Sequence, residues 1–373
     1  MNIVLIAAWG LAAVSAFFVH PDSAYVNYPD YHTLGLLFCL MCVMAGLQRL
    51  GVFSYGAGKL LARVRTTRQM ELILVFLCFF SSMIITNDVA LITFVPFAME
   101  VLAMAEMKKS LVPLVVMQTV AANLGSMLTP IGNPQNLYLY SKSGYGVIKF
   151  MGLMAPYAAV AFGLILVILL LRRSIPLGAV PMTGSGSLSA PDFASGIGLK
   201  KLVTYMLLFI LCLGAVAGVV PVWALVALCV ILVAVMDVAA LKKVDYSLLL
   251  TFTGFFVFIG NMGRLPAFCA LLERMIGGNE VLTAVAASQV MSNVPAALLL
   301  SGFTQRYDAL LIGTNVGGLG TLIASMASLI SYRFMAAAYP KWRLSYMIVF
   351  TAVNVMFLVV MLGLYGLMGT AGI

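Results

Sequence analysis

The chain has 373 residues, of which 63% are hydrophobic and 9% are charged, and its mean hydropathy is +1.10. A soluble domain carries about a quarter charged residues, so the composition excludes a soluble globular protein and predicts an all-α integral membrane protein. The net charge of +9 would suit a nucleic-acid partner, but the basic residues are spread over loops between apolar runs. Such residues act as orientation signals for membrane segments. We therefore expect a lipid bilayer around the chain and no nucleic-acid partner.

The first apolar run, residues 2–19, is interpreted as a membrane helix. Its "AVSA" could mark a signal-peptide cleavage site, but no Lys or Arg precedes the run, as a signal peptide would require. The next loop holds His20 and His32, which could bind a metal but are better explained as loop-capping residues. The six cysteines lie in apolar runs without metal-ligand spacing, and we interpret them as small packing residues.

The apolar run at 70–106 is too long for one membrane passage at 1.5 Å per residue. It is interrupted at Thr86-Asn87-Asp88, which separates two arms of about 16 residues. Basic residues flank both ends of the run, so both ends are expected on the cytoplasmic side. The sequence therefore predicts a re-entrant hairpin with its tip at these three residues. Irregular backbone at membrane depth is tolerated only where it is buried in protein or lines a cavity.

The next run, 111–141, predicts a broken helix. Its centre reads "ANLGSMLTPIGNPQNL", where Pro130 and Pro134 lack the N–H groups that a continuous helix needs. Asn, Thr and Gly surround the two prolines and supply short neutral oxygens, amides and exposed backbone. The candidate binding residues in this segment are Asn123, Gly125, Thr129, Gly132 and Asn133.

The second half of the chain repeats both features. "SQVMSNVPAALLLSGFT" matches the hairpin, with Ser292-Asn293 opposite Thr86-Asn87. "TNVGGLGTLIASMASL" aligns without gaps to the broken helix of the first half. This alignment pairs Asn123 with Asn315, Gly125 with Gly317, Thr129 with Thr321, and Asn133 with Ser325.

Basic residues predict the orientation of the two copies. With the N-terminus inside and hairpins counted as non-crossing, 16 of the 21 basic residues fall in cytoplasmic loops. The C-terminus and both ends of the second hairpin then lie outside, so the copies form two inverted-topology repeats with about nine crossings and two hairpins. The loops assigned to the cytoplasm are 49–68, 107–109, 172–201, 242–243 and 333–343.

The repeat also predicts the domain organisation. We expect a first repeat at 1–171, a flexible Gly-, Pro- and Ser-rich cytoplasmic linker at 172–201, and a second repeat at 202–373. The helix at 202–220 is the extra passage that inverts the second copy. The segments 49–66 and 262–277, which precede each hairpin and mix basic with apolar residues, are interpreted as interfacial amphipathic helices rather than ordinary loops.

Paired broken helices in inverted repeats are typical of a secondary transporter with a midplane site. Carbonyl groups at the end of a half-helix can bind a cation, and free N–H groups at the start of the next attract an anion. We expect the four interruptions to converge. The candidate substrate- and ion-binding residues are Thr86, Asn87, Asp88, Asn123, Gly125, Thr129, Gly132, Asn133, Ser292, Asn293, Asn315, Gly317, Thr321 and Ser325.

Asp88 is the most informative of these residues, because an aspartate at mid-membrane costs about 2.5–3.5 kcal/mol on insertion scales and is a functional candidate by default. Its repeat partner is Val294, and no Lys, Arg or His lies within the predicted membrane cores. Its counter-ion is therefore a transported cation, a proton or a set of amide donors. A bound Na⁺ would be held by Asp88, Asn87, Asn123 and Asn293. We expect no other cofactor, and no catalytic constellation indicates an enzyme.

The quoted motifs resemble the ion transporter superfamily over nearly the whole chain. The resemblance is strongest at "TNDVALITFVPF" (86–97), "NLGSMLTPIGNPQNL" (123–137) and "SNVPAALL" (292–299). It favours the arsenite permease branch with its anion-permease, citrate transporter-like relatives, and it extends to divalent anion:sodium symporters and NhaD-type antiporters. The resemblance implies that the hairpin tips and broken helices form the binding sites and that one bundle moves past the other as an elevator. Relatives include dimers, so a homodimer is compatible with it.

Two departures from the family bear on the substrate. The dicarboxylate branch has Ser-Asn-Thr at its hairpin tips, whereas this chain has Thr-Asn-Asp and Ser-Asn-Val, and its second broken helix lacks the Thr-Pro-Ile-Gly turn. Dicarboxylate, oxyanion and arsenite all stay open. We expect a secondary active transporter of a small inorganic or organic anion in the cell inner membrane, coupled to H⁺ or Na⁺. The alternatives are an NhaD-type Na⁺/H⁺ antiporter, an arsenite/antimonite efflux permease and, with less support, a passive channel.

Overall fold

The computed structural model describes residues 3–176 and 196–370, and this part of the chain is helical and contains no strand. The all-α prediction is therefore confirmed. Most of the predicted linker, residues 177–195, lies outside the described residues. The division into two repeats and a linker stays a prediction.

Each helix of the first half begins or ends at a recognisable signal. Asp30 caps the second helix by accepting a hydrogen bond from Thr33 N at 3.0 Å, and Pro134 opens the seventh at a position where its missing N–H is not needed. The helices are α1 Ile3–Phe18, η1 Ser23–Asn27, α2 Tyr31–Arg49, α3 Val52–Leu61, α4 Thr67–Ile85, α5 Asn87–Met104, α6 Lys108–Ser126, α7 Pro134–Ser143 and α8 Val147–Leu170.

The second half begins with α9, the helix expected to invert the second repeat. Further along the chain, Asp245 caps α12 by accepting a hydrogen bond from Leu248 N at 3.0 Å. The helices are α9 Gly196–Val216, α10 Val222–Met236, α11 Val238–Leu241, α12 Tyr246–Met262, α13 Pro266–Ile276, α14 Glu280–Met291, α15 Asn293–Leu300, α16 Tyr307–Val316, α17 Met326–Ala338, η5 Pro340–Trp342 and α18 Arg343–Thr370.

Six helices of the described chain are long and apolar enough to cross a membrane, or seven if α12 and α13 count as one bent span. This agrees with an integral membrane protein. The expected nine crossings also include shorter helices, such as the 16-residue α1 and the 15-residue α10, which fall below the length of a full span. The number of crossings therefore stays a prediction.

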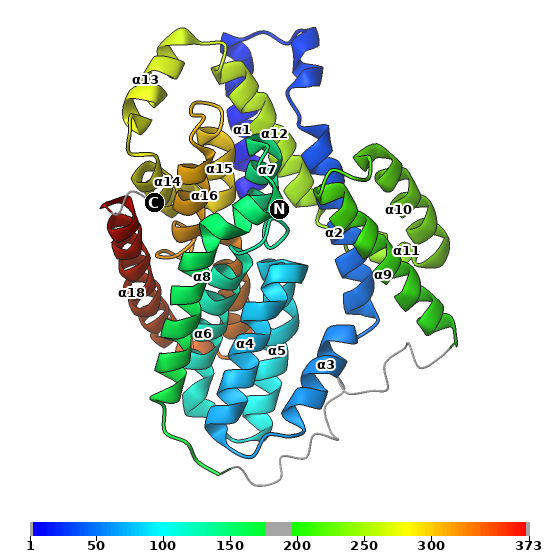
Figure 1. The fold of residues 1–373 in the computed structure, drawn as a ribbon, viewed down its shortest axis with the longest axis vertical. Coiled ribbons are helices and arrows are strands. Elements are labelled where there is room, and N and C mark those ends of the chain that lie inside the picture. Colours follow the sequence, from blue (N-terminus) through cyan, green and yellow to red (C-terminus); the bar gives the residue numbers. More distant parts are fainter. Residues whose placement is uncertain (1–2, 177–195, 371–373) are drawn as a thin grey trace.

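The helices form two groups that meet at the centre of the molecule. In the core group, α4 packs on α5 and α6, α6 packs on α8 and α18, and α14 packs on α15 and α16. The core group also includes α7, which packs on α15 and α16, and α17, which packs on α5 and α6. In the flanking group, α1 packs on α12, α2 packs on α9 and α10, and α11 packs on α2 and α10. Figure 1 shows α9 and α10 at one edge of the molecule, away from α4, α6 and α8. The interface between the two groups positions the candidate site.

Both hairpin tips adopt the same unusual backbone. Thr86 has φ 70° and ψ 150°, and Ser292 has φ 77° and ψ 153°. This conformation is almost restricted to glycine and costs about 1–3 kcal/mol in other residues. It turns the chain so sharply that α5 begins at Asn87 and α15 at Asn293, directly after each tip. The predicted breaks are thus confirmed, and strained backbone of this kind clusters at functional sites.

Each tip also makes the same hydrogen bond to its own broken helix. The N–H of Asn87 donates to the carbonyl of Gly132, and the N–H of Asn293 donates to the carbonyl of Ala324, both at 3.0 Å. Gly132 and Ala324 are partners in the gapless alignment. Two pairs of positions that the alignment makes equivalent therefore form the same hydrogen bond. The inverted orientation of the two copies in the membrane stays a prediction, although α4 and α5 lie in the lower half of Figure 1 and α14 and α15 in its upper half.

The broken helices unwind where the sequence predicts. Helix α6 ends at Ser126 and α7 starts at Pro134, while α16 ends at Val316 and α17 starts at Met326. Although α4 and α5 are long enough to be separate spans, their tip contacts the unwound stretch 127–133 inside the protein. A re-entrant hairpin makes this kind of contact.

The segments predicted to be interfacial are helical in the structure, as α3 and α13. Helix α13 bends away from α12 by 106° after a break at Gly263–Leu265. A bend of this size points α13 across the direction of α12, as an interfacial helix requires. The position of both helices at the membrane surface stays a prediction.

A repeated close contact joins each hairpin to its broken helix. A Cβ atom on Gly125 would collide with the carbonyl oxygen of Phe79 and lie 2.8 Å from Ser82 Oγ, and one on Gly317 would lie 2.7 Å from Ser288 Oγ. Ser82 and Ser288 are equivalent in the repeat. The two glycines therefore allow close helix packing, which in membranes relies on small residues. Both glycines were predicted as binding residues, and in the structure each one makes room for a neighbouring helix.

We expect Gly125→Ala to prevent normal packing of α4 on α6 and to lower the yield of folded protein by about tenfold, because the added methyl group meets backbone that cannot move aside. Gly163→Ala in α8 is the matched control, since nothing lies within 4 Å of its added Cβ. Size-exclusion chromatography and thermal unfolding of the two variants in detergent provide the measurement. Equal yields and melting temperatures would contradict the packing role of Gly125.

Candidate functional site

A buried network of amide side chains joins the first hairpin tip to both broken helices. Asn87 Nδ2 donates to Asn123 Oδ1 at 3.1 Å, and Ser325 Oγ donates to the same oxygen at 3.0 Å. Asn123 Nδ2 in turn donates to Ser328 Oγ at 3.4 Å. All four side chains are buried. Residues about 200 positions apart in the sequence thus share one acceptor, and the expected convergence of these interruptions agrees with the structure.

A second branch of the network is centred on Asn133. Its Nδ2 donates to Asn315 Oδ1 at 3.1 Å and to Ser126 Oγ at 3.2 Å, while its Oδ1 accepts from Asn136 N at 2.9 Å and so caps α7. Asn315 Nδ2 donates to Asn136 Oδ1 at 2.6 Å. Because every amide in this branch has a partner, the branch holds the two unwound stretches in one arrangement.

Thr129 and Thr321 bind backbone of the hairpins. Thr129 Oγ1 donates to the carbonyl of Met83 at 2.5 Å, and Thr321 Oγ1 donates to the carbonyl of Gln289 at 3.2 Å. Met83 and Gln289 are again equivalent positions of the repeat. Both threonines were predicted as binding residues, and the structure shows them fastening each broken helix to its hairpin.

Gln289 is a residue of this region that sequence reasoning missed. Its Nε2 donates to the carbonyls of Gly317 and Leu319, both at 2.9 Å, and its Oε1 accepts from Thr321 N at 2.9 Å. It therefore satisfies the unwound backbone of the second copy. A glutamine within a short apolar helix was the signal that could have identified it.

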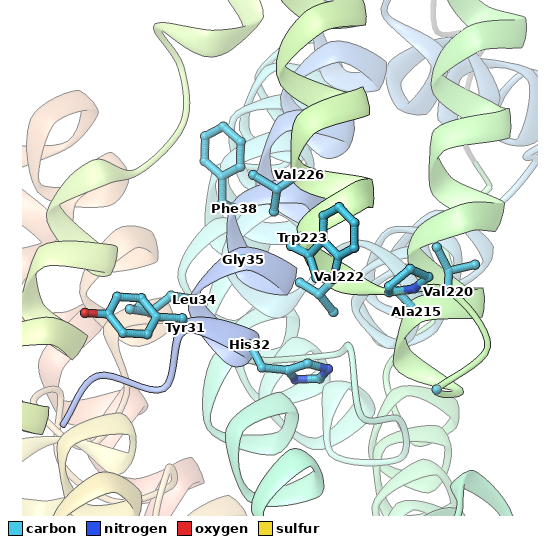
Figure 2. Close-up of a pocket in the computed structure, with 12 residues that line it drawn as sticks. Tyr31, His32, Leu34, Gly35, Phe38, Ala215, Val220, Val222, Trp223 and Val226 are labelled. Atoms are coloured by element: carbon cyan, nitrogen blue, oxygen red, sulfur yellow. The ribbon is translucent and has the colours of Figure 1, made fainter. Parts of the chain in front are cut away.

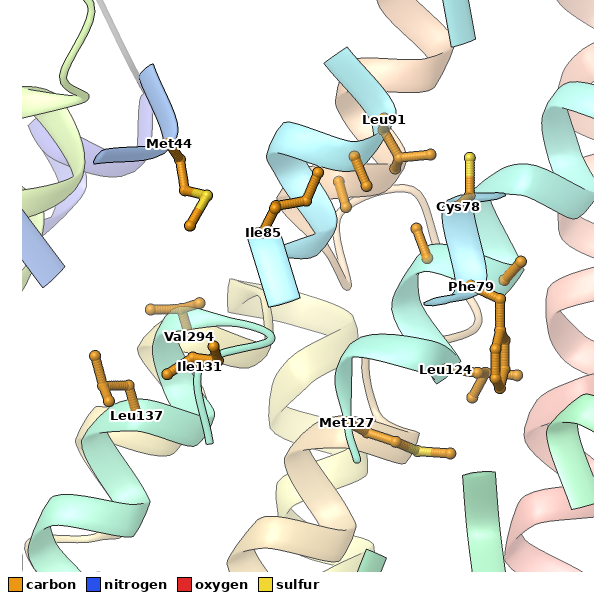
Figure 3. Close-up of a cluster of buried hydrophobic side chains, with 14 of the residues drawn as sticks. Met44, Cys78, Phe79, Ile85, Leu91, Leu124, Met127, Ile131, Leu137 and Val294 are labelled. Atoms are coloured by element: carbon orange, nitrogen blue, oxygen red, sulfur yellow. The ribbon is translucent and has the colours of Figure 1, made fainter. Parts of the chain in front are cut away.

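The residue after the asparagine of each tip distinguishes the two copies. Asp88 is half-buried and lines a cavity, whereas its repeat partner Val294 is buried among apolar side chains. Figure 3 draws Val294 within the hydrophobic cluster that also contains Ile131 and Leu137. The predicted residues of the second tip, Ser292 and Asn293, are buried as well. The two tips therefore differ in their surroundings as well as in sequence. Asp88 belongs to the wall of a cavity, and Val294 belongs to the hydrophobic core.

The cavity beside Asp88 has a volume of about 310 Å³ and lies between the core and flanking groups. Three predicted residues line it: Thr86 and Asp88 from the first hairpin and Asn133 from the broken helix. Five residues of α2, among them Gln48, form the facing wall. The side chain of Gln48 bridges the groups by donating to Thr93 Oγ1 at 3.2 Å. The predicted residues Asn87, Asn123, Asn293 and Asn315 are buried and do not line this cavity.

Two basic residues also line the cavity: Lys243, which precedes α12, and Arg333 of α17. Sequence reasoning placed both in cytoplasmic loops and concluded that Asp88 has no basic residue nearby. Tertiary structure brings them to the same cavity as Asp88, together with Asp245, and all three are exposed. The cavity therefore opens on the side that the charge count assigns to the cytoplasm.

A larger cavity of about 780 Å³ lies at the other end of α2 and differs in chemistry. Figure 2 shows Phe38, Val222, Trp223 and Val226 along this groove between α2 and α10, with His32 at one side. Its walls are mainly apolar and carry no carboxylate or ammonium group. We therefore place the candidate site at the smaller cavity.

The described part of the chain contains no group of three or more His, Cys, Asp or Glu side chains that could hold a metal ion. His32 Nδ1 lies 3.2 Å from Ser141 Oγ, so this contact joins α2 to α7, and the expected loop-capping role of His32 stays a prediction. Five of the six cysteines are buried, as packing residues would be. The proposed Na⁺ ligands therefore stay a prediction based on amide and carboxylate oxygens.

This helical fold, with strained hairpin tips, unwound helices and a charged cavity inside the bundle, is that of a membrane transporter. Residues 1–306 match the citrate transporter family, and the chain belongs to that family. The resemblance to the ion transporter superfamily is thereby confirmed. The protein is a multi-pass membrane transporter of the citrate transporter and anion permease type, and it is not an enzyme.

Several proteins of other organisms are similar to this chain. Inner membrane protein YbiR of Escherichia coli is 32% identical over 84% of this chain and 82% of that protein. An uncharacterized transporter of Methanocaldococcus jannaschii is 32% identical over 82% of this chain and 81% of its own length. The silicon efflux transporter LSI3 of rice is 31% identical, but over only 41% of this chain and 31% of that protein.

Proposed function

We propose that the protein is a secondary active transporter that carries a small anion through the 310 Å³ cavity together with H⁺ or Na⁺. One observation carries the proposal: a hairpin-tip carboxylate, Asp88, shares the cavity with Lys243 and Arg333. An intramembrane carboxylate marks an ion pathway by default. The two basic groups attract an anion, and their position beside Asp88 was not evident from the sequence alone.

The charges of the cavity give a reason for coupling. Its four charged residues are Asp88, Asp245, Lys243 and Arg333, so their formal charges cancel. Protonation of Asp88, or Na⁺ bound beside it, leaves a net positive cavity that attracts an anion. The anion in turn favours retention of the proton or cation, because coupling between two bound ligands is reciprocal. The expected mode of transport is therefore symport.

The position of the cavity supports an elevator-like alternating-access mechanism. Asp88, Asn133 and Arg333 belong to the core group, whereas Gln48 and Lys243 belong to the flanking group. Movement of the core group past the flanking group would separate these two walls and expose the tip to the other side of the membrane. In this proposal the present arrangement is the inward-open state, because the exposed rim comes from predicted cytoplasmic loops.

The cavity and the family together indicate the substrate class. The family name indicates citrate, and a cavity of about 310 Å³ suits a small organic acid or oxyanion. A multiply charged anion would need bound cations to offset Asp88 and Asp245. The name of the rice relative indicates silicon efflux, and another partial relative is a putative transporter arsB of Dictyostelium discoideum, so metalloid acids belong in the test set.

Flux into proteoliposomes tests the proposal. Purified protein is reconstituted, and uptake of labelled citrate, smaller carboxylates, inorganic oxyanions and arsenite is measured with imposed H⁺ or Na⁺ gradients. We expect saturable uptake of at least one anion that a gradient of one cation accelerates. Flux that rises linearly with concentration and ignores both gradients would overturn active transport and favour a channel.

A Na⁺/H⁺ antiporter is the second candidate, and one observation favours it: two carboxylates, Asp88 and Asp245, line the same cavity and could bind the exchanged cations. An antiporter needs no anion to exchange Na⁺ for H⁺. Sodium-driven proton movement in proteoliposomes that contain only an impermeant anion would support the antiporter. Its absence, together with gradient-driven anion uptake, would support the symporter.

The basic residues of the cavity provide a separate prediction. We expect Arg333→Gln and Lys243→Gln each to raise the half-saturation concentration of the anion by about tenfold, because each removes a charged partner of the substrate. Lys341→Gln and Lys242→Gln are the matched controls, since both residues are exposed in the same predicted loops and neither lines the cavity. Uptake kinetics measure the effect. Unchanged affinity in the first pair would remove these residues from the site.

A further inference from the structure

A second candidate binding site lies where α6 and α18 begin, outside the transport cavity. A cavity of about 250 Å³ separates the first turns of the two helices. Lys108 and Lys109 border it from α6, and Trp342 and Ser345 border it from η5 and α18. Neither lysine forms an ion pair within the described residues, and both are exposed. The cavity therefore offers two positive charges that take part in no ion pair of the described residues.

The walls of this cavity change from polar to apolar along the helices. Beyond the lysines, its lining continues with Val112 and Pro113 on α6 and Val349 on α18. The exposed apolar residues Leu344 and Ile348 on α18 continue the nonpolar surface beside it. A free inorganic anion would use only the basic rim, whereas a phospholipid would use both parts, with its phosphate at the lysines and its acyl chains along the valines.

The location of the cavity agrees with a lipid headgroup. Lys108 and Lys109 lie in the predicted cytoplasmic loop 107–109, and Trp342 lies in the predicted loop 333–343. Trp342 stacks on Tyr339 with ring centroids 5.3 Å apart. Trp and Tyr gather at the level of the headgroups, and basic pockets between helices on the cytoplasmic side bind anionic headgroups.

The absence of carboxylates and the apolar wall together favour this face of α6 over the other. A second cavity of about 550 Å³ also borders Lys108 and Lys109, but Arg172, Arg173 and two carboxylates, Glu71 and Glu106, line it as well, and Glu71 pairs with Arg172 at 3.2 Å. The face toward α18 carries no carboxylate. We propose that the cavity between α6 and α18 binds the phosphate headgroup of an anionic phospholipid from the cytoplasmic leaflet.

The test measures lipid binding to the purified full-length protein in a nonionic detergent. Thermal unfolding is followed with short-chain phosphatidylglycerol, with phosphatidylcholine of the same chain length and with inorganic phosphate. We expect phosphatidylglycerol to raise the melting temperature, and the other two to have little effect. The double variant Lys108→Gln, Lys109→Gln should weaken phosphatidylglycerol binding by about 25-fold, since each basic residue near a membrane surface contributes about fivefold. Higher salt should weaken it further.

Two further variants make the result decisive. Ser345→Glu adds a carboxylate to the cavity and should also abolish the phosphatidylglycerol effect. The double variant Lys200→Gln, Lys201→Gln, in the first turns of α9 at the end of the predicted cytoplasmic linker, removes the same charge elsewhere and should leave the phosphatidylglycerol effect unchanged. An equal response to phosphatidylcholine, an equal response to inorganic phosphate, or full binding by the Lys108 and Lys109 variant would each overturn the proposal.

Discussion

Replacing Asp88 with Asn is expected to abolish ion-coupled transport while the protein still folds. Asparagine has almost the same shape, and the hydrogen bond from the Asp88 N–H to Asn87 Oδ1, 3.0 Å long, uses backbone that the substitution retains. The variant resembles a permanently protonated Asp88 and can no longer gain or lose the coupling charge. We expect gradient-driven uptake to fall by about 100-fold, the loss of one interaction with a charged group. Its dependence on pH and Na⁺ should become flat.

Asp245→Asn is the matched control for this experiment. Asp245 lines the same cavity but caps α12, a role that asparagine can also fill. The control should change anion affinity and retain the dependence of uptake on pH or Na⁺. Flux measurements in proteoliposomes over a series of pH values and Na⁺ concentrations compare the two variants. Wild-type coupling in Asp88→Asn would rule out this carboxylate as the carrier of the coupling ion.

Asn133→Ala is expected to destabilise the protein by about 3 kcal/mol, because the substitution removes the cap of α7 and leaves buried polar groups without partners. The lost hydrogen bonds include those to Asn315 and Ser126. A lost cap costs about 1 kcal/mol, and each unsatisfied buried group costs about 1–3 kcal/mol. Because Asn133 also lines the cavity, uptake should fall even in protein that remains folded.

Asn354→Ala is the control that tests whether loss of any buried asparagine destabilises the protein as much as loss of Asn133. Asn354 is also fully buried, but its Nδ2 makes a single bond, to the carbonyl of Phe350 at 2.9 Å, and its Oδ1 has no hydrogen-bond partner in the described structure. We expect this control to cost about 1 kcal/mol and to leave uptake unchanged. Denaturant unfolding in detergent gives the comparison. Equal losses of stability in the two variants would contradict a special role for the network.

The two hairpin tips share one backbone conformation and differ at the residue that follows each tip asparagine. Thr86 and Ser292 adopt nearly the same φ and ψ angles, and each precedes an asparagine that bonds its broken helix. The next residue decides the chemistry, because Asp88 lines the charged cavity and Val294 joins the hydrophobic cluster. In the proposed mechanism the first tip carries the coupling ion, and the second tip contributes mainly packing and backbone.

The sequence by itself determined the membrane class, the hairpin break at Thr86 and the broken helices. These features depend on local hydropathy, on prolines and on polar residues within apolar runs, all of which act over a few turns of helix. Only the tertiary structure decided that Asn123 accepts from Ser325, that Thr129 holds the hairpin backbone, and that Lys243 and Arg333 share a cavity with Asp88. Such contacts join residues that lie far apart in the sequence, and the direction of each side chain is set by how the helices dock rather than by their composition.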